Sequence, residues 1–176
     1  MPSRRIFFTS AVAASLAALT GCGWEPLYAD RAAGPADADL AAIKVAPIPE
    51  RAGQLLALKL RQWLNPAGEP VASRYLLRTL LQTSRLDLAP LPIGLATRAR
   101  VDAYATFTLI ELASGAPLLT QTSHAVDSFD IITNYYSNVV AEQDASERVI
   151  EEIRRDMVTK LTVFLQRRAA EAAPRP

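Results

Sequence analysis

Cysteine and histidine are almost absent from this chain. The 176 residues include one cysteine, Cys22, and one histidine, His124. A single cysteine excludes an internal disulfide framework and a cluster of thiolate metal ligands. With only seven glycines, the sequence shows no Gly-rich phosphate-binding loop, and no spaced set of metal ligands occurs. We therefore expect no catalytic residues, no metal, no cofactor and no enzymatic activity.

An excess of charge of either sign is also missing. The chain has 19 Lys and Arg residues against 18 Asp and Glu residues, so no overall field attracts nucleic acid. A binding site for an anion would have to be a local patch. Hydrophobic residues make up 50% of the chain, which favours a folded domain over a disordered one.

The N-terminal region has the parts of an export signal. Residues 6–19 carry no charge and are mostly apolar, and Arg4 and Arg5 precede them. An uncleaved membrane anchor is the alternative, but the apolar run is shorter than the roughly 20 residues that a spanning helix needs. The arginine pair also fits a twin-arginine signal. Because adjacent arginines are common in ordinary signals, the export route stays open.

The signal ends in Leu19-Thr20-Gly21-Cys22, the pattern that the bacterial lipoprotein signal peptidase recognises. It predicts removal of residues 1–21 and acylation of Cys22, for example with palmitate. More than one acyl chain anchors a protein firmly in a membrane. The next residue is Gly23, not the Asp that commonly retains lipoproteins in the inner membrane. This permits an outer-membrane location on the periplasmic side of a Gram-negative cell.

Residues 22–42 are predicted to form a lipidated N-terminal segment and a linker. Trp24 and Tyr28 are unusual in a plain tether, which would be polar and flexible. We expect them either at the membrane interface, where amphipathic rings are favoured, or packed against a partner or the chain's own domain. Residues 29–39 are rich in Ala, Asp, Gly and Pro and have the composition of a linker.

A first strand and a first helix follow this segment. Residues 43–48 alternate between apolar and other side chains, and Pro47 is expected to end the strand or place it at an edge. Pro49 and Glu50 open a helix that runs to Leu64, because proline suits the first helical turn. Asn65-Pro66 stops the helix.

Three further strands are expected, over residues 74–88, 97–112 and 118–129. The second has the clearest alternation, with an apolar face and a polar face, whereas a helix competes over 74–88 because the leucine spacing fits it nearly as well. Ser114-Gly115 makes a hairpin turn before the last strand. Residues 89–94 form a turn whose tip exposes Leu91 and Ile93, which suggests contact with a partner.

The last predicted element is a helix over residues 140–168, after a loop at 130–138, and residues 169–176 are expected to be a disordered tail. Each amphipathic element needs one apolar surface to bury against. The fold class is therefore α+β: two helices on one face of a four-stranded mixed sheet, in the order β-α-β-β-β-α, over a single domain at 43–168.

Several short motifs together carry a family resemblance. They are Gly21-Cys22-Gly23-Trp24-Glu25-Pro26-Leu27-Tyr28, Ile48-Pro49-Glu50-Arg51-Ala52-Gly53-Gln54, Tyr104, Tyr136-Ser137, and Ala141-Glu142-Gln143-Asp144-Ala145. With these motifs the chain resembles the LPS-assembly lipoprotein family (LptE), especially its alphaproteobacterial branch. The resemblance implies a small plug inside a large outer-membrane β-barrel, the LPS-assembly protein LptD. There it would support barrel assembly and help to move lipopolysaccharide to the cell surface.

Arginine side chains are the candidates for contact with lipopolysaccharide, because phosphates favour the fork of the guanidinium group. Arg98 and Arg100 share the polar face of one strand, and we expect Arg78 or Arg85 beside them. The alternative is a solvated strand face, or salt links with Asp102 and Asp127. Tyr104, on the same face, is a candidate contact with the barrel, whose lumen is polar.

Two other functions remain open from the residues. One is a lipoprotein accessory component of an ABC-type periplasmic lipid transporter, which would enclose an apolar pocket. The other is a scaffold lipoprotein without a lipid ligand.

Overall fold

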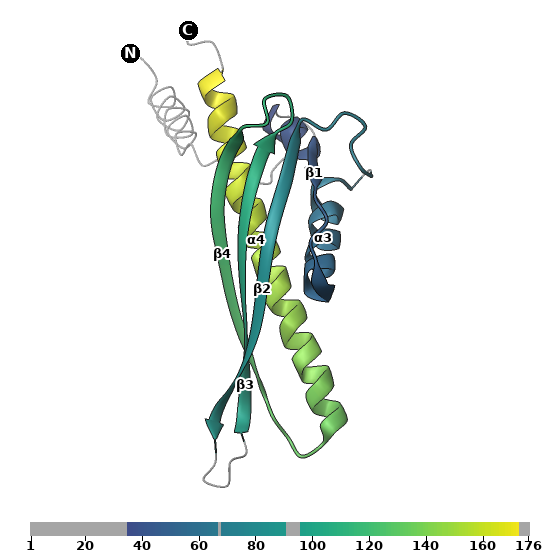
Figure 1. Ribbon diagram of the computed structural model, residues 1–176, viewed down its shortest axis with the longest axis vertical. Helices are drawn as coiled ribbons and strands as arrows, with labels where there is room; N and C mark the ends of the chain where they lie inside the picture. The colour runs from purple at the N-terminus through teal and green to yellow at the C-terminus, as the bar shows by residue number, and fades with distance from the viewer. Residues whose placement is uncertain (1–34, 67, 91–95, 173–176) are drawn as a thin grey trace, which may run out of the picture. The chain divides into compact units, whose positions relative to one another are not determined.

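The computed structural model describes residues 35–66, 68–90 and 96–172, and the chain forms the predicted α+β fold (Figure 1). Its elements follow in the order α2 (Pro35–Ala41), β1 (Ile43–Val45), α3 (Glu50–Leu64), β2 (Tyr75–Pro90), β3 (Ala96–Glu111), β4 (Pro117–Asp130) and α4 (Tyr135–Ala172). The four strands make one mixed sheet in the order β1-β2-β3-β4. β1 is parallel to β2, and the other neighbours are antiparallel.

β2, β3 and β4 are long and pair over most of their length. The β2–β3 register runs from Tyr75 opposite Glu111 to Pro90 opposite Ala96, and β4 returns along β3 after the turn at Gly115. Gly115 has a φ of 69°, a left-handed conformation that glycine adopts without a steric penalty. β1 pairs only with Tyr75–Leu77, because Pro47 follows it and cannot donate to a ladder.

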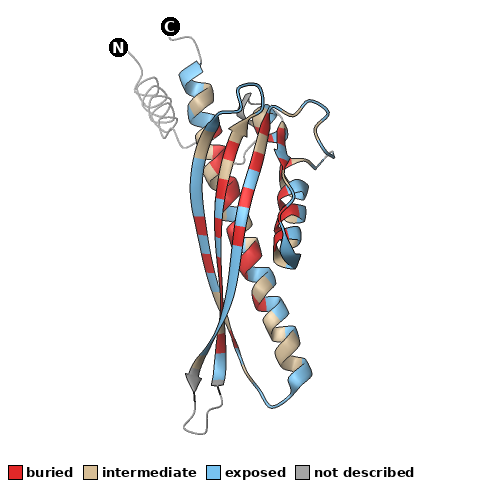
Figure 2. Ribbon diagram, in the orientation of Figure 1, coloured by how far each residue is buried: buried red, intermediate tan, exposed pale blue. Residues whose placement is uncertain are grey.

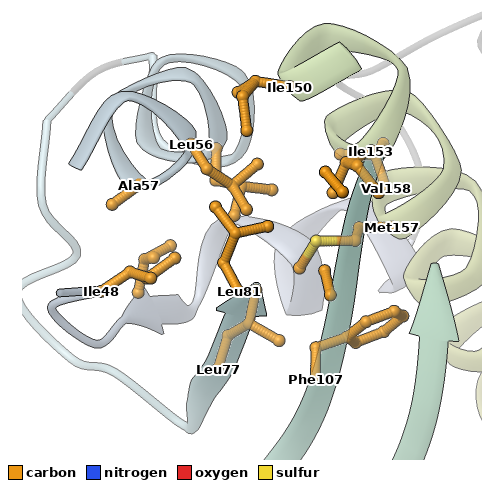
Figure 3. Close-up of a cluster of buried hydrophobic side chains, with 14 of the residues drawn as sticks. Ile48, Leu56, Ala57, Leu77, Leu81, Phe107, Ile150, Ile153, Met157 and Val158 are labelled. Carbon is orange, nitrogen blue, oxygen red and sulfur yellow. The ribbon is translucent and has the colours of Figure 1, made fainter. Parts of the chain in front are cut away.

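α3 and α4 cover one face of the sheet, and α4 runs behind the three long strands in the view of Figure 1. Alternate residues along the strands are buried on that side, which Figure 2 shows as red bands along the ribbons. Figure 3 shows the centre of this core, where side chains of α3, α4, β2 and β3 meet. Among them are Leu56, Leu77, Leu81, Phe107, Ile150, Ile153 and Met157. The apolar stripes predicted for the two helices are thus the surfaces that cover the sheet.

The structure differs from the sequence prediction at several points and settles one open alternative. The expected linker contains the short helix α2, and residues 74–88 form a strand, so the competing helix was wrong. α4 begins at Tyr135, inside the predicted loop, because the side chain of Asn134 accepts a hydrogen bond from the backbone N–H of Ser137 (3.3 Å) and caps the helix. α4 also continues to Ala172, four residues into the predicted tail.

The predicted export signal, the lipidation site Cys22 and its recognition residues Leu19, Thr20 and Gly21 lie outside the described residues. So do Trp24, Tyr28, Leu91 and Ile93. Among the helices that the structure describes, none has the length and apolar character to cross a membrane.

Two parts of the chain lie in close contact at the start of α3, where Gly53 packs against Ile48. Glu50 has a φ of 64°, and Gly53 lies against the buried side chain of Ile48. A Cβ on Gly53 would come within 2.6 Å of Ile48 Cγ2, a distance that forces a shift of packed atoms. Glycine at 53 is therefore required by packing against the residue that leads into the helix.

We expect Gly53→Ala to destabilise the fold by about 1–3 kcal/mol, the usual cost of overpacking a buried site. Chemical denaturation of both variants measures this difference. Ile48→Ala removes the opposing Cγ2, so the same Gly53→Ala change should cost less in that background. An equal cost in both backgrounds would contradict the steric explanation.

Glu151 on α4 joins the two large helices. Its carboxylate lies 2.6 Å from Arg154 Nη2 and 3.5 Å from Lys59 Nζ of α3. The hydrogen bond from Arg154, together with the charges of Arg154 and Lys59, lowers the pKa of Glu151 from 4.5 to about 2, against an opposing effect of burial. A carboxylate whose pKa is lower in the folded state stabilises the fold at pH values above its unfolded pKa. This contribution is lost as the pH falls towards the folded pKa of about 2.

We expect Glu151→Gln to lower the free energy of unfolding by about 1 kcal/mol at pH 7, a value reduced by solvent screening of the pair. The difference from the wild type should shrink as the pH falls from 4.5 towards 2. Chemical denaturation across this pH range measures the difference in free energy of unfolding. The control is Glu152→Gln, which makes the same change at an exposed neighbouring residue. A pH-independent difference would show that the charge is not responsible.

Candidate functional site

The face of the sheet opposite α3 and α4 is the candidate functional site, and we call it the open face. No other element of the described residues packs over it, and Figure 2 shows exposed residues along all three long strands. Its side chains come from alternate residues that the strand register sets side by side. They are Leu76, Arg78, Leu80, Gln82, Ser84, Leu86 and Leu88 on β2; Arg98, Arg100, Asp102, Tyr104, Thr106, Thr108 and Ile110 on β3; and Thr120, Thr122, His124, Val126, Ser128 and Asp130 on β4.

Tyr104 stands near the middle of the open face. The register places it between Gln82 of β2 and His124 of β4. The rings of Tyr104 and His124 are stacked, with centroids 4.0 Å apart and an angle of 8° between the planes. Tyr104 is 52% exposed. The pair therefore offers a flat aromatic surface, with a phenol group that can donate or accept a hydrogen bond.

Asp102 lies next to this pair and is the one charged residue in the buried set of the described residues. Arg100 Nε donates a hydrogen bond to Asp102 Oδ2 at 2.8 Å, and His124 Nε2 lies 3.6 Å from Oδ1. A buried carboxylate costs free energy unless a charged partner compensates it, and Arg100 supplies that charge. The salt link with Asp102, which the sequence analysis gives as an alternative for these arginines, is therefore present for Arg100.

Arg98 and Arg100 lie on the open face as the sequence predicts. Arg98 donates to Ser128 Oγ at 2.7 Å and lies 3.9 Å from Asp130. The side chains of Arg98 and Arg100 are 55% and 41% exposed, so both guanidinium groups stay in contact with solvent. The salt link considered with Asp127 is not formed with these arginines. Asp127 pairs with Arg148 of α4, on the covered side of the sheet.

Arg78 and Arg85 do not lie beside Arg98 and Arg100. Arg78 shares the open face but stands opposite Thr108, ten residues along β3 from Arg98, which is about 33 Å in a strand. Arg85 lies on the covered side, because odd and even residues of a strand point to opposite faces. There it pairs with Glu142 of α4 at 2.8 Å and with Asp87 at 3.1 Å. The expected group of three arginines was therefore wrong.

The open face also carries apolar side chains that the sequence analysis did not single out. Leu80, Leu86 and Val126 are 58%, 50% and 46% exposed. The strand alternation contains the signal that places them there, because each shares its face with the polar residues of its own strand. Threonines fill the space between them, and Thr108 and Thr120 are hydrogen-bonded across the strands at 3.2 Å. The surface mixes apolar groups with hydroxyl, amide and guanidinium groups.

No protein-family model matches the chain, and no characterised protein matches it in sequence. Solved structures do match. A provisionally assigned lipoprotein of Caulobacter crescentus aligns with a TM-score of 0.63 at 20% identity, over 78% of this chain and 98% of its own. A minor lipoprotein of Acinetobacter baumannii aligns with a TM-score of 0.56 at 17% identity, over 70% and 92%. The chain therefore has a fold that also occurs in bacterial lipoproteins.

Proposed function

We propose that this protein is an outer-membrane lipoprotein whose open face seats inside the LPS-assembly barrel LptD and supports its assembly. The observation that carries the proposal is the uncovered sheet. Three long strands present a continuous surface of hydroxyl, amide, charged and aromatic groups, while both large helices cover the other side. The interior of a large membrane barrel is polar, and a surface of this kind suits it. The fold shared with lipoproteins agrees with the predicted lipid anchor at Cys22.

The proposed role is structural and not catalytic. Tyr104 and His124 supply stacking area at the centre, and the threonines supply short hydrogen-bonding groups that fit a flat contact. Leu80 and Leu86 add apolar area that would leave water on docking. We infer that lipopolysaccharide contacts the end of this face that holds Arg98 and Arg100, because their exposed guanidinium groups suit phosphate groups.

Leu80 and Leu58 allow a matched test of the docking face. Both are exposed leucines, Leu80 on the open face at 58% and Leu58 on α3 at 50%. We expect Leu80→Glu to lower recovery of the barrel about tenfold or more, because a carboxylate would lose its water in the contact. Leu58→Glu should leave recovery unchanged. The measurement is affinity capture of the tagged full chain from detergent-solubilised outer membranes.

The same capture experiment distinguishes the proposal from transport by an ABC-type complex. Recovery of a very large β-barrel in stoichiometric amount supports the proposal. Recovery of inner-membrane ATPase components in place of the barrel would contradict it, and so would equal loss of the barrel in both leucine variants.

Charge reversal tests contact with lipopolysaccharide separately. We expect Arg98→Glu combined with Arg100→Glu to weaken binding of purified lipopolysaccharide about tenfold or more, because each loses a charge-assisted hydrogen bond. The control reverses Arg51 and Arg167, two exposed arginines on the helices, and so makes the same change in net charge. Equal effects in both double variants would show that only the net charge matters.

A further inference from the structure

The connection from β4 into α4 gathers exposed apolar side chains. Residues 131–141 contain no charged side chain, although charged residues make up 21% of the chain. Within this stretch Ile132, Tyr135, Tyr136 and Val140 are 54%, 81%, 75% and 39% exposed, and we call these four residues the tyrosine patch. A single exposed apolar residue is ordinary on a protein surface, whereas a group of them calls for an explanation.

The tyrosine patch is held in a fixed shape by two asparagines. The side chain of Asn138 accepts a hydrogen bond from the backbone N–H of Ile132 at 2.8 Å and donates one to its carbonyl at 2.7 Å. Asn134 caps α4, so Tyr135 and Tyr136 lie in an ordered first turn. In the part of the chain that the structure describes, neither phenol group has a hydrogen-bond partner. A rigid surface of this kind loses little conformational entropy on binding.

The patch begins beside the open face and continues onto the outer side of α4. The backbone N–H of Ile131 donates to the carbonyl of Thr97 at 2.9 Å, so the β3–β4 ladder reaches the patch, and Asp130 lies on the open face. Tyr136 precedes the buried Ala145 by nine residues, which is about two and a half helical turns. Because Ala145 faces the core, Tyr136 points away from the sheet.

The charges around the patch favour a protein partner over a lipid surface. The first charged residues on either side of the uncharged stretch are Asp130 and Glu142, which are both acidic. Glu142 is paired with Arg85 at 2.8 Å, so the two charges compensate each other. A helix that binds a membrane surface usually carries lysines and arginines beside its apolar residues, because they attract anionic lipids. The tyrosine patch lacks such a basic border in the sequence.

We propose that the tyrosine patch is a second contact with the wall of the barrel, an inference that rests on the proposed function. The wall segment that it meets carries no charge and presents apolar groups to Ile132 and Val140. It also offers hydrogen-bonding groups to the two phenols, since a phenol that loses water needs a new partner. Tyrosine is among the residues that contribute most to binding at such contacts.

The position of the patch requires a partner that curves around this end of the domain. The open face and the outer side of α4 lie on opposite sides of the sheet, so a flat partner cannot cover both. α3 ends well short of the connection between β4 and α4 in the view of Figure 1, and only the long strands and α4 reach this end. A surrounding wall therefore meets the tyrosine patch without enclosing α3.

The contact is made by side chains and not by adding a strand to β4. Lys160 of α4 donates a hydrogen bond from Nζ to the backbone carbonyl of Thr122 at 2.7 Å, and a lysine at an edge obstructs strand pairing. Further along the same edge, Asp127 Oδ1 accepts a hydrogen bond from the backbone N–H of Ser128 at 2.7 Å. Both backbone groups are therefore already bonded within the chain.

Photo-cross-linking of the full chain in cells tests the geometry. A photoreactive amino acid replaces Tyr136, Leu80 of the open face or Leu58 of α3, three exposed residues, and mass spectrometry identifies the products. We expect a product with the barrel from Tyr136 and from Leu80, and none from Leu58. A barrel product from Leu80 but only lipid, or nothing, from Tyr136 overturns this inference and leaves the proposed function standing. No barrel product from Leu80 overturns the proposed function, and with it the contact inferred here.

A capture experiment measures the strength of the contact. We expect Tyr135→Ser combined with Tyr136→Ser to lower recovery of the barrel about tenfold, because two exposed aromatic contacts are lost. The control is Leu58→Ser combined with Val71→Ser, which removes two exposed apolar side chains elsewhere and should leave recovery unchanged. Replacing both tyrosines with phenylalanine keeps the rings and should retain more of the barrel than the serine pair. Equal recovery with the serine pair and with its control overturns the proposal.

Discussion

Burial on one side of the sheet is the constraint on which the rest of the structure depends. Because side chains alternate along a strand, packing α3 and α4 against Leu77, Phe107 and their neighbours leaves the other half of every long strand facing outward. The apolar residues of β3 point into the core, whereas Tyr104, the threonines and the arginines lie on the open face. The open face and the core are thus two results of one periodic pattern, and a shift of one residue would exchange them.

The fold was largely predictable because its elements follow simple periods. The alternation from Ala99 to Leu109 indicated β3, and the stripe from Ala145 to Leu165 indicated most of α4. Boundaries were harder, since they depend on single side-chain contacts. α4 starts early because the Asn134 side chain caps it, and the side chain of Asn138 holds both backbone groups of Ile132. Such contacts between particular pairs leave no periodic pattern in the sequence.

The arginines of the candidate site show what the alternation within one strand cannot predict, namely how residues of different strands lie relative to one another. Alternation placed Arg98 and Arg100 correctly on one face, because both lie on β3. The position of Arg78 relative to this pair depended on the register between β2 and β3, and that of Arg85 depended on which face of β2 the helices cover. The observed register separates Arg78 from the pair, and the alternation along β2 places Arg85 beside Glu142 on the covered side. The stacking of Tyr104 on His124 likewise follows from the β3–β4 register.

The hydrogen bond from Lys160 to Thr122 has a consequence for how many copies can join. If both edges of the sheet accepted a strand, each new copy would present another free edge, and assembly would continue into a fibre. The amino group of Lys160 occupies the backbone carbonyl of Thr122, so a strand that added to β4 at this point would have to displace it. A single side chain on a helix thus protects this part of the sheet edge against the addition of further strands.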